Sequence, residues 1–216
     1  MLIASYNPQE LGDTLIVIVA QDTPEQAHTV RDGIARIYDA ETEKTLGYNF
    51  LEISKILPNI SGNGQVMLTV DDVAALNAAL EDAGFNGELV ADTESKFIVG
   101  YVKTATPHPD SDHLLVTETV VDNDQSVQIV SGSPNMQADI KVVVAKVGAM
   151  MPNGLIIWPG ALRGVESDGM ICSGRELRLA NAPQRPGALI LPDDYEVGEP
   201  FDFERGQTIF MAQENA

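Results

Sequence analysis

The spacing of hydrophobic residues differs between the two halves of the chain. In the first half, an apolar run over residues 14–21 predicts a β-strand, and two further strands are predicted over 34–38 and 46–53. The polar segment between these two strands, residues 39–44, has the length of a hairpin connection. The first half is therefore predicted to contain a β-hairpin.

A helix is the clearest element of the first half. Thr69 is a suitable N-cap, with Asp72 in the capping-box position three residues later, and Gly84 is a suitable end. The apolar residues between these signals recur at spacings of three and four and so share one face: Val73, Leu76, Leu80 and Ala83. A helix combined with strands predicts an α+β domain.

The second half shows short apolar runs separated by Gly, Pro and Asn turns. The runs that predict strands are 97–103, 114–121, 127–130, 141–147, 155–158 and 188–191. Residues 152–154, Pro-Asn-Gly, are a tight-turn signal between two of them. This pattern is typical of a small all-β barrel or sandwich.

The polar segment 91–95 separates the two patterns. We therefore predict an α+β domain over residues 1–93, an all-β domain over 94–205 and a tail over 206–216.

The charge restricts the partners of this protein. The chain has 216 residues with 13 Lys and Arg against 32 Asp and Glu, a net charge of −19. Such a chain repels nucleic acid at long range. The segment 141–187 is an exception, because it holds 6 basic and 3 acidic residues. It permits local contact with phosphates, and the sum predicts weak nonspecific binding.

Other features favour a cytoplasmic protein without a membrane segment. The longest apolar run, residues 15–20, is too short to span a bilayer, and no basic stretch precedes an apolar core at the N-terminus. The single cysteine, Cys172, has no internal disulfide partner. No catalytic signature or nucleotide-binding motif is present, so we expect neither an enzyme nor a cofactor.

Five motifs follow one another in the second half. They are Val-Gly-Tyr-Val at 99–102, His-Pro-Asp-Ser-Asp-His-Leu at 108–114, Ile-Val-Ser-Gly-Ser-Pro-Asn at 129–135, Lys-Val-Val-Val-Ala-Lys-Val-Gly-Ala at 141–149 and Leu-Arg-Gly-Val-Glu-Ser-Asp-Gly-Met-Ile-Cys-Ser at 162–173. This series resembles the tRNA-binding domain near the N-terminus of bacterial phenylalanyl-tRNA synthetase β chains. It is also similar to domains appended to methionyl-tRNA synthetases and to free-standing tRNA-binding proteins. Together with the acidic α+β domain, it resembles the small bacterial YtpR family.

The resemblance implies a fold, a function and partners. The all-β domain would be a barrel of the oligonucleotide-binding (OB) type that binds folded tRNA without catalysis. The partners would be tRNA and, in addition, an aminoacyl-tRNA synthetase or a second copy of the chain in a homodimer. The function of the α+β domain is not implied.

The resemblance also points to binding residues. On or near the RNA face it places Asn135, Arg163, Ser167, Met170 and Ser173. Lys103, Lys141 and Lys146 would add point charges if they face the groove, whereas His113 stands where the family usually has Lys or Arg. Since a histidine side chain is mostly neutral near pH 7, one fixed charge is missing there.

Alternatives remain open at the level of sequence. The barrel would serve as a protein-interaction module if it kept its fold and lost strong RNA binding. His108, Asp110, Asp112 and His113 lie within six residues and would suit a hard cation, but a loop explains them more simply. A further alternative is that three arginines only form a solvated surface and pair with acidic residues of the same chain, such as Glu166 and Glu176. These arginines are Arg163, Arg175 and Arg178.

Overall fold

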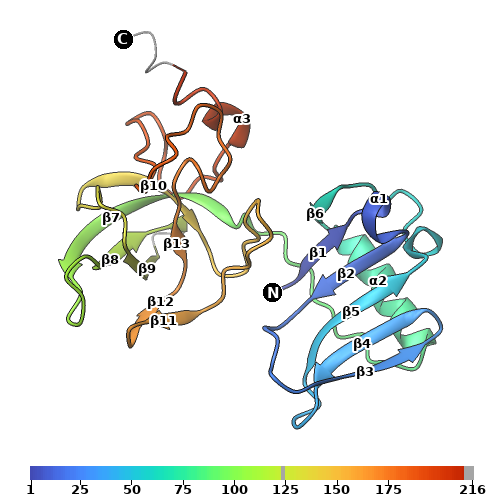
Figure 1. Ribbon diagram of the computed structural model, residues 1–216. Helices are drawn as coiled ribbons and strands as arrows, with labels where there is room; N and C mark the ends of the chain where they lie inside the picture. Colours follow the sequence, from blue (N-terminus) through green and yellow to red (C-terminus); the bar gives the residue numbers. More distant parts are fainter. Residues whose placement is uncertain (123–124, 212–216) are drawn as a thin grey trace. The chain divides into compact units, whose positions relative to one another are not determined.

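The computed structural model describes residues 1–122 and 125–211. The chain forms two compact units, Met1–Glu94 and Ser95–Ala216 (Figure 1). Each unit has its own sheet and its own hydrophobic core.

The first unit is a six-stranded antiparallel sheet with the order β3-β4-β5-β2-β1-β6. Its strands are β1 (Ile3–Tyr6), β2 (Thr14–Ile18), β3 (Gln26–Arg31), β4 (Ile34–Asp39), β5 (Thr45–Leu51) and β6 (Gly64–Val66). Helix α2 (Val70–Asp82) packs on one face of the sheet (Figure 1), and two short helices complete the unit: α1 (Pro8–Leu11) and η1 (Ile53–Lys55).

Helix α2 confirms the predicted cap and the predicted apolar face. The Thr69 hydroxyl accepts a hydrogen bond from the Asp72 N–H at 3.1 Å, and the Asp72 carboxylate accepts one from the Thr69 N–H at 2.9 Å. The capping box therefore satisfies two amides that the first turn leaves without partners. The inner face buries Leu76 and Leu80 completely against the central strands of the sheet.

The strands of the first unit were predicted only where they are apolar. Strands β2, β4 and β5 match the predicted runs, and 39–44 joins β4 to β5 in an antiparallel hairpin. Strands β1, β3 and β6 were not predicted. Strand β3 is an exposed edge strand with a polar sequence, and the other two are very short, so none carries a clear period-two signal.

The second unit is a barrel built on a five-stranded antiparallel sheet with the order β13-β10-β7-β8-β9. Its strands are β7 (Phe97–Pro107), β8 (Leu115–Val120), β9 (Ser126–Ser131), β10 (Ile140–Ala145) and β13 (Met170–Ile171). The fold class predicted from the sequence, α+β followed by an OB-type barrel, is confirmed. The apolar run of β10 arises because Val142 and Val144 face one core cluster while Val143 and Ala145 face another.

A short hairpin closes the barrel beside β9. Strands β11 (Gly160–Leu162) and β12 (Val165–Ser167) form the hairpin, whose end runs along β9. The Asp168 N–H donates to the Gln128 carbonyl at 2.9 Å, and the Gln128 amide donates to the Glu166 carbonyl at 2.7 Å. The Val130 N–H donates to the Ser167 hydroxyl at 3.1 Å. The outer side of β9 is thus occupied by the chain itself.

Two predicted strands of this unit are wrong. Residues 155–158 and 188–191 make only isolated bridges, at Ile156 and Ile190. The first segment bonds to the turn at 148–151, and the second divides its bonds between Cys172 and Lys141, so neither builds a continuous ladder with one partner. Near the C-terminus, α3 (Phe203–Gly206) spans the expected start of the tail, and residues 212–216 of that tail lie outside the described residues.

Candidate nucleic-acid interface

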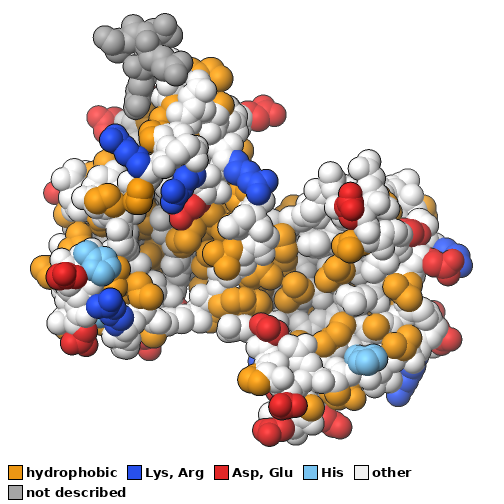
Figure 2. Space-filling view, viewed as in Figure 1, with side chains coloured by type: hydrophobic (Ala, Val, Ile, Leu, Met, Phe, Trp, Pro, Cys, Tyr) orange, Lys and Arg blue, Asp and Glu red, His pale blue; other side chains and the backbone are white. Residues whose placement is uncertain are grey.

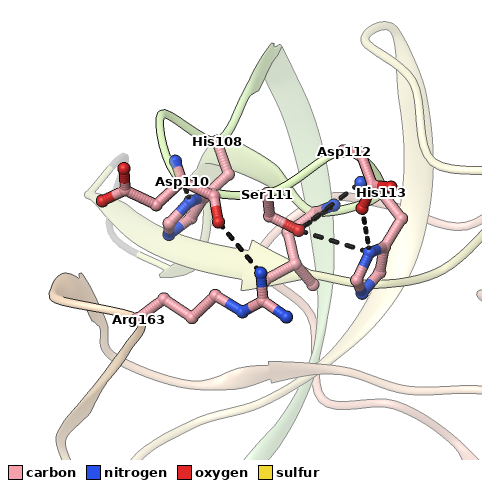
Figure 3. A network of polar contacts seen from close by, with 7 residues as sticks. His108, Asp110, Ser111, Asp112, His113 and Arg163 are labelled. Atoms are coloured by element: carbon pink, nitrogen blue, oxygen red, sulfur yellow. Dashed lines mark hydrogen bonds and ion pairs between the residues drawn. The ribbon is translucent and has the colours of Figure 1, made fainter.

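Arg163 lies at the tip of the β11–β12 hairpin and contacts the loop between β7 and β8 (Figure 3). Its Nη1 donates to the Asp110 carbonyl at 2.9 Å. His108, only 3% exposed, holds the same hairpin: its Nδ1 accepts from the Asp110 N–H at 3.0 Å, and its Nε2 lies 3.0 Å from the Leu162 carbonyl. Because Nδ1 accepts, the proton belongs on Nε2, which donates to Leu162. His108 therefore links the β7–β8 loop to Leu162, the residue that precedes Arg163.

His113 is exposed in the same loop, and its imidazole turns toward neighbouring polar groups (Figure 3). Its Nδ1 lies 2.8 Å from the Asp112 carboxylate and 3.3 Å from the Ser111 hydroxyl. This hydrogen bond lowers the pKa of Asp112. Within residues 1–122 and 125–211, no group of three or more His, Cys, Asp or Glu side chains is arranged to hold a metal ion.

Three of the predicted residues meet at a pair of adjoining cavities beside β13. Ser173 lines both cavities, Met170 lines the smaller one of about 260 Å³, and Asn135 lines the larger one of about 450 Å³. The two cavities also share Pro186 and Gly187. The structure thus brings Asn135, Met170 and Ser173 together.

Hydrogen bonds fix the polar side chains of this group. The Asn135 amide donates to the Ala188 carbonyl at 2.9 Å and accepts from the Ala188 N–H at 2.8 Å. The Ser173 hydroxyl donates to the Glu176 carboxylate at 2.7 Å. These bonds hold the loops that form the cavity walls, and among the described residues they use one of the two N–H groups of the Asn135 amide. Ser167, nearby in sequence, uses its hydroxyl to close the barrel.

The predicted lysines do not line these cavities. Lys103 occupies a β-bulge of β7 and pairs with Glu118 at 2.8 Å, which lowers the pKa of Glu118. Lys146 pairs with Asp122 at 2.8 Å, with both side chains largely buried. Each lysine charge is therefore offset by a carboxylate of the same unit.

Three arginines that we did not predict as site residues occupy the loop after β13: Arg175, Arg178 and Arg185. All three are exposed, and in the part of the chain that the structure describes their side chains make no ion pair or hydrogen bond. Arg175 lines the smaller cavity and Arg185 the larger. No pairing of these arginines with Glu176 is present among the described residues, and one oxygen of that carboxylate accepts from the Ser173 N–H and hydroxyl. The basic balance of 141–187 was the signal for these residues. Figure 2 shows basic side chains in the upper part of the second unit and again beside a histidine lower down.

Other features of the described chain are structural. Cys172 is fully buried, and burial raises the pKa of its thiol, which disfavours the reactive thiolate form. No helix within the described residues has the length and apolar character needed to cross a bilayer.

Comparison with known proteins identifies both units. Residues 97–200 match the family model "Putative tRNA binding domain", and residues 21–92 match "Domain of unknown function (DUF4479)". Phenylalanine–tRNA ligase beta subunits of Idiomarina loihiensis and Oceanobacillus iheyensis are 45% and 42% identical over 114 and 121 residues, but these alignments cover only 14% and 15% of those proteins. The Bacillus subtilis (strain 168) protein named "Putative tRNA-binding protein YtpR" is 43% identical over 201 residues, 93% of this chain and 99% of that one. Because that alignment spans nearly the whole of both chains, this protein belongs to the YtpR family.

Proposed function

We propose that this protein binds folded tRNA without catalysing a reaction on it, and that the second unit provides the contact surface. The family model over 97–200 and the name of the Bacillus subtilis relative support tRNA as the ligand. The observation that carries the proposal is a group of three exposed arginines in the loop after β13 that have no side-chain partner among the described residues: Arg175 and Arg185, which line the two cavities, and Arg178. We call these three residues the arginine group.

The arginine group has a clear electrostatic role in an acidic protein. Lys103, Lys141 and Lys146 each donate to carboxylates or carbonyls of the second unit. Exposed arginines without such partners keep all five guanidinium donors for a ligand, and the planar fork matches two oxygens of a phosphate. Phosphates held at this place lie beside the cavity walls formed by Asn135 and Ser173.

Arg163 supports a second contact on the same proposal. It uses one N–H for the Asp110 carbonyl, which leaves the remaining guanidinium donors for RNA. His113 lies in the loop that Arg163 contacts, so this region forms a weaker, less charged part of the interface. Met170 would contribute an apolar wall, whereas Ser167, Lys103 and Lys146 would support the surface from its edges.

Binding of purified tRNA at several salt concentrations tests the proposal. We expect affinity to fall steeply with salt, because each neutralised phosphate adds about 0.7 to 0.9 to the slope of log K against log salt. Replacement of the arginine group by alanine should weaken binding at least about tenfold and reduce that slope by about two to three.

A control variant separates this effect from a change in net charge. Lys44 is exposed in the first unit and has no side-chain partner in the described structure, so Lys44→Ala removes a charge far along the chain from the arginine group. This variant should bind as the parent does. The proposal fails if the parent protein does not bind tRNA at low salt. It also fails if Lys44→Ala lowers tRNA affinity by as much, for each charge removed, as the triple alanine variant of the arginine group.

The same proposal places the protein in the cytoplasm, where tRNA is found. An aminoacyl-tRNA synthetase partner and a homodimer stay predictions. Sizing in solution, with and without tRNA, would test the homodimer, and a dimer that forms only with tRNA would show that the RNA bridges two copies.

A further inference from the structure

We propose that the larger cavity of the second unit takes a single unstacked nucleotide of the bound RNA, with its base against Phe210 and its phosphates at Arg175 and Arg185. This inference rests on the proposed function and names the part of the RNA that this site receives. Folded RNA presents such nucleotides in its loops and at its ends, and these are where proteins read it most specifically.

Phe210 provides the stacking surface. It is half-buried, packs against the core cluster beneath the C-terminal loops, and lines the larger cavity. Its ring lies against the backbone of Gly174, where an added Cβ would be only 2.6 Å from Phe210 Cε2 and 2.8 Å from Cζ. A glycine at position 174 is therefore required for the ring to lie in this place. Gly174 thus meets one edge of the ring, and the ring also borders the cavity.

The remaining walls suit a flat, partly polar ligand. Pro134, Pro183 and Pro186 are rigid and contribute apolar surface, and Asn135 is an exposed polar residue in the wall. The volume of about 450 Å³ lies within the usual range for small-molecule pockets, roughly 300–1,000 Å³. Phe210 is the one aromatic side chain among the residues that line the described cavity, so it accommodates one base and not a stacked run.

The charges favour a nucleotide over an apolar peptide. Arg185 lines this cavity, and Arg175 lines the smaller one that adjoins it through Ser173, Pro186 and Gly187. Aliphatic, aromatic and proline residues line the cavity together with Asn135 and Ser173. Two guanidinium groups that have no partner among the described residues lie beside this mixed lining, and the combination matches a group that carries phosphates on an aromatic base. The sequence pattern did not point to Phe210, because it lies in the predicted tail.

Competition with short RNA tests the inference. A single-stranded tetraribonucleotide containing 2-aminopurine and a blunt RNA duplex of 12 base pairs would be titrated into the parent protein. We expect the tetranucleotide to bind with a change in 2-aminopurine emission and to compete with tRNA, whereas the duplex leaves the emission signal of the bound tetranucleotide in place.

Variants at Phe210 then separate stacking from folding. Phe210→Ala should weaken tetranucleotide binding about tenfold, and Phe210→Trp should retain it, because stacking on an aromatic ring accounts for that difference. Gly174→Ala should weaken it as well, since the ring must move. Thermal unfolding of each variant verifies that the second unit remains folded, and the retained binding of Phe210→Trp keeps the test valid if the alanine variant unfolds.

The outcomes distinguish this inference from the proposed function. If tRNA does not bind the parent protein at all, the proposed function fails. If tRNA binds but the tetranucleotide does not compete, or if Phe210→Ala binds it as the parent does, only the inference is overturned. If Phe210→Ala instead changes a dimer into a monomer in sizing experiments, with tetranucleotide binding unaltered, a second copy of the chain occupies the cavity and the inference is also overturned.

Discussion

The two units differ in how many of their arginines have partners within the protein. In the first unit, Arg31 donates to the Gly84 carbonyl at 2.5 Å and lies over the Phe85 ring, and Arg36 donates to the Thr45 hydroxyl at 2.9 Å and lies over Tyr38. In the second unit, Arg163 and Arg205 also have internal partners, whereas the arginine group makes no such contact within residues 1–122 and 125–211. Cations that are bound internally stabilise the fold, whereas cations without partners are available to a ligand. The net charge of −19 conceals this difference, so the placement of the charges is the better guide to function.

The variant with the largest expected effect tests whether tRNA binding depends on the stability of the first unit. Leu80 is fully buried beneath the sheet, so Leu80→Ala should destabilise the first unit by about 2–5 kcal/mol through lost contacts and a cavity. Calorimetry should show one shifted transition, while tRNA affinity remains unchanged at a temperature where both units are folded.

Val70→Ala provides a matched control for that experiment. Val70 lies on the same helix but is 63% exposed, so its loss should cost no more than about 0.5 kcal/mol. A fall in tRNA affinity with Leu80→Ala and not with Val70→Ala would contradict the separation of roles between the units.

The next largest effect concerns Arg163. Arg163→Ala should weaken binding of all tRNAs about tenfold and reduce the salt slope by about one, since it removes one charged phosphate contact. Filter binding across a salt series would measure both quantities. Lys55→Ala removes an exposed charge of the first unit and serves as the control. Equal losses of tRNA affinity in the two variants would exclude a local role for Arg163.

A smaller, favourable change is expected at His113. His113→Lys introduces the positive charge that similar tRNA-binding domains usually have at this position. We therefore expect tRNA to bind about threefold more tightly, and the slope of log K against log salt to be steeper by about one. The same titration measures it. If affinity falls, the imidazole makes a specific contact that lysine cannot replace.

The smallest effect is a pH dependence confined to the first unit. In the hairpin turn, Asp39 accepts hydrogen bonds from the Thr42 N–H and the Thr42 hydroxyl, each at 2.7 Å, and these lower its pKa from 3.8 to about 2. The folded pKa lies below the unfolded one, so this contribution to stability is present above about pH 4 and is lost as the pH falls through about 2. Asp39→Asn should make the thermal unfolding temperature of the first unit less dependent on pH over that range, as measured by calorimetry. A matching change in the unfolding of the second unit would show that the two units unfold together.

The sequence was informative where contacts are local or hydrophobic periodicity is strong. The capping box of Thr69 and Asp72 involves residues three apart, and the apolar run of β10 is continuous because both of its faces are buried. Hydrophobic periodicity did not predict β3, which is a polar edge strand, or the β11–β12 hairpin, whose strands have three residues each.

The candidate site was harder to predict because its contacts span long stretches of chain. Asn135 was expected on the RNA face, but its hydrogen bonds to Ala188, 53 residues away, depend on tertiary structure. Phe210 and Arg185 reach the cavities through loops with no regular pattern, so neither position has a local signal. The basic balance of 141–187 pointed to a segment and not to individual residues within it.

The seam between β9 and the β11–β12 hairpin has a further consequence for the protein in a crowded solution. An uncovered edge strand exposes a row of amides and carbonyls that pairs readily with other chains and starts aggregation. Here Ser167, Glu166 and Asp168 occupy that row at Val130 and Gln128. The hydrogen bonds of Asp168 and Ser167 therefore satisfy backbone groups of β9 that would otherwise be open to pairing with another chain, and they do so without adding a strand to the sheet.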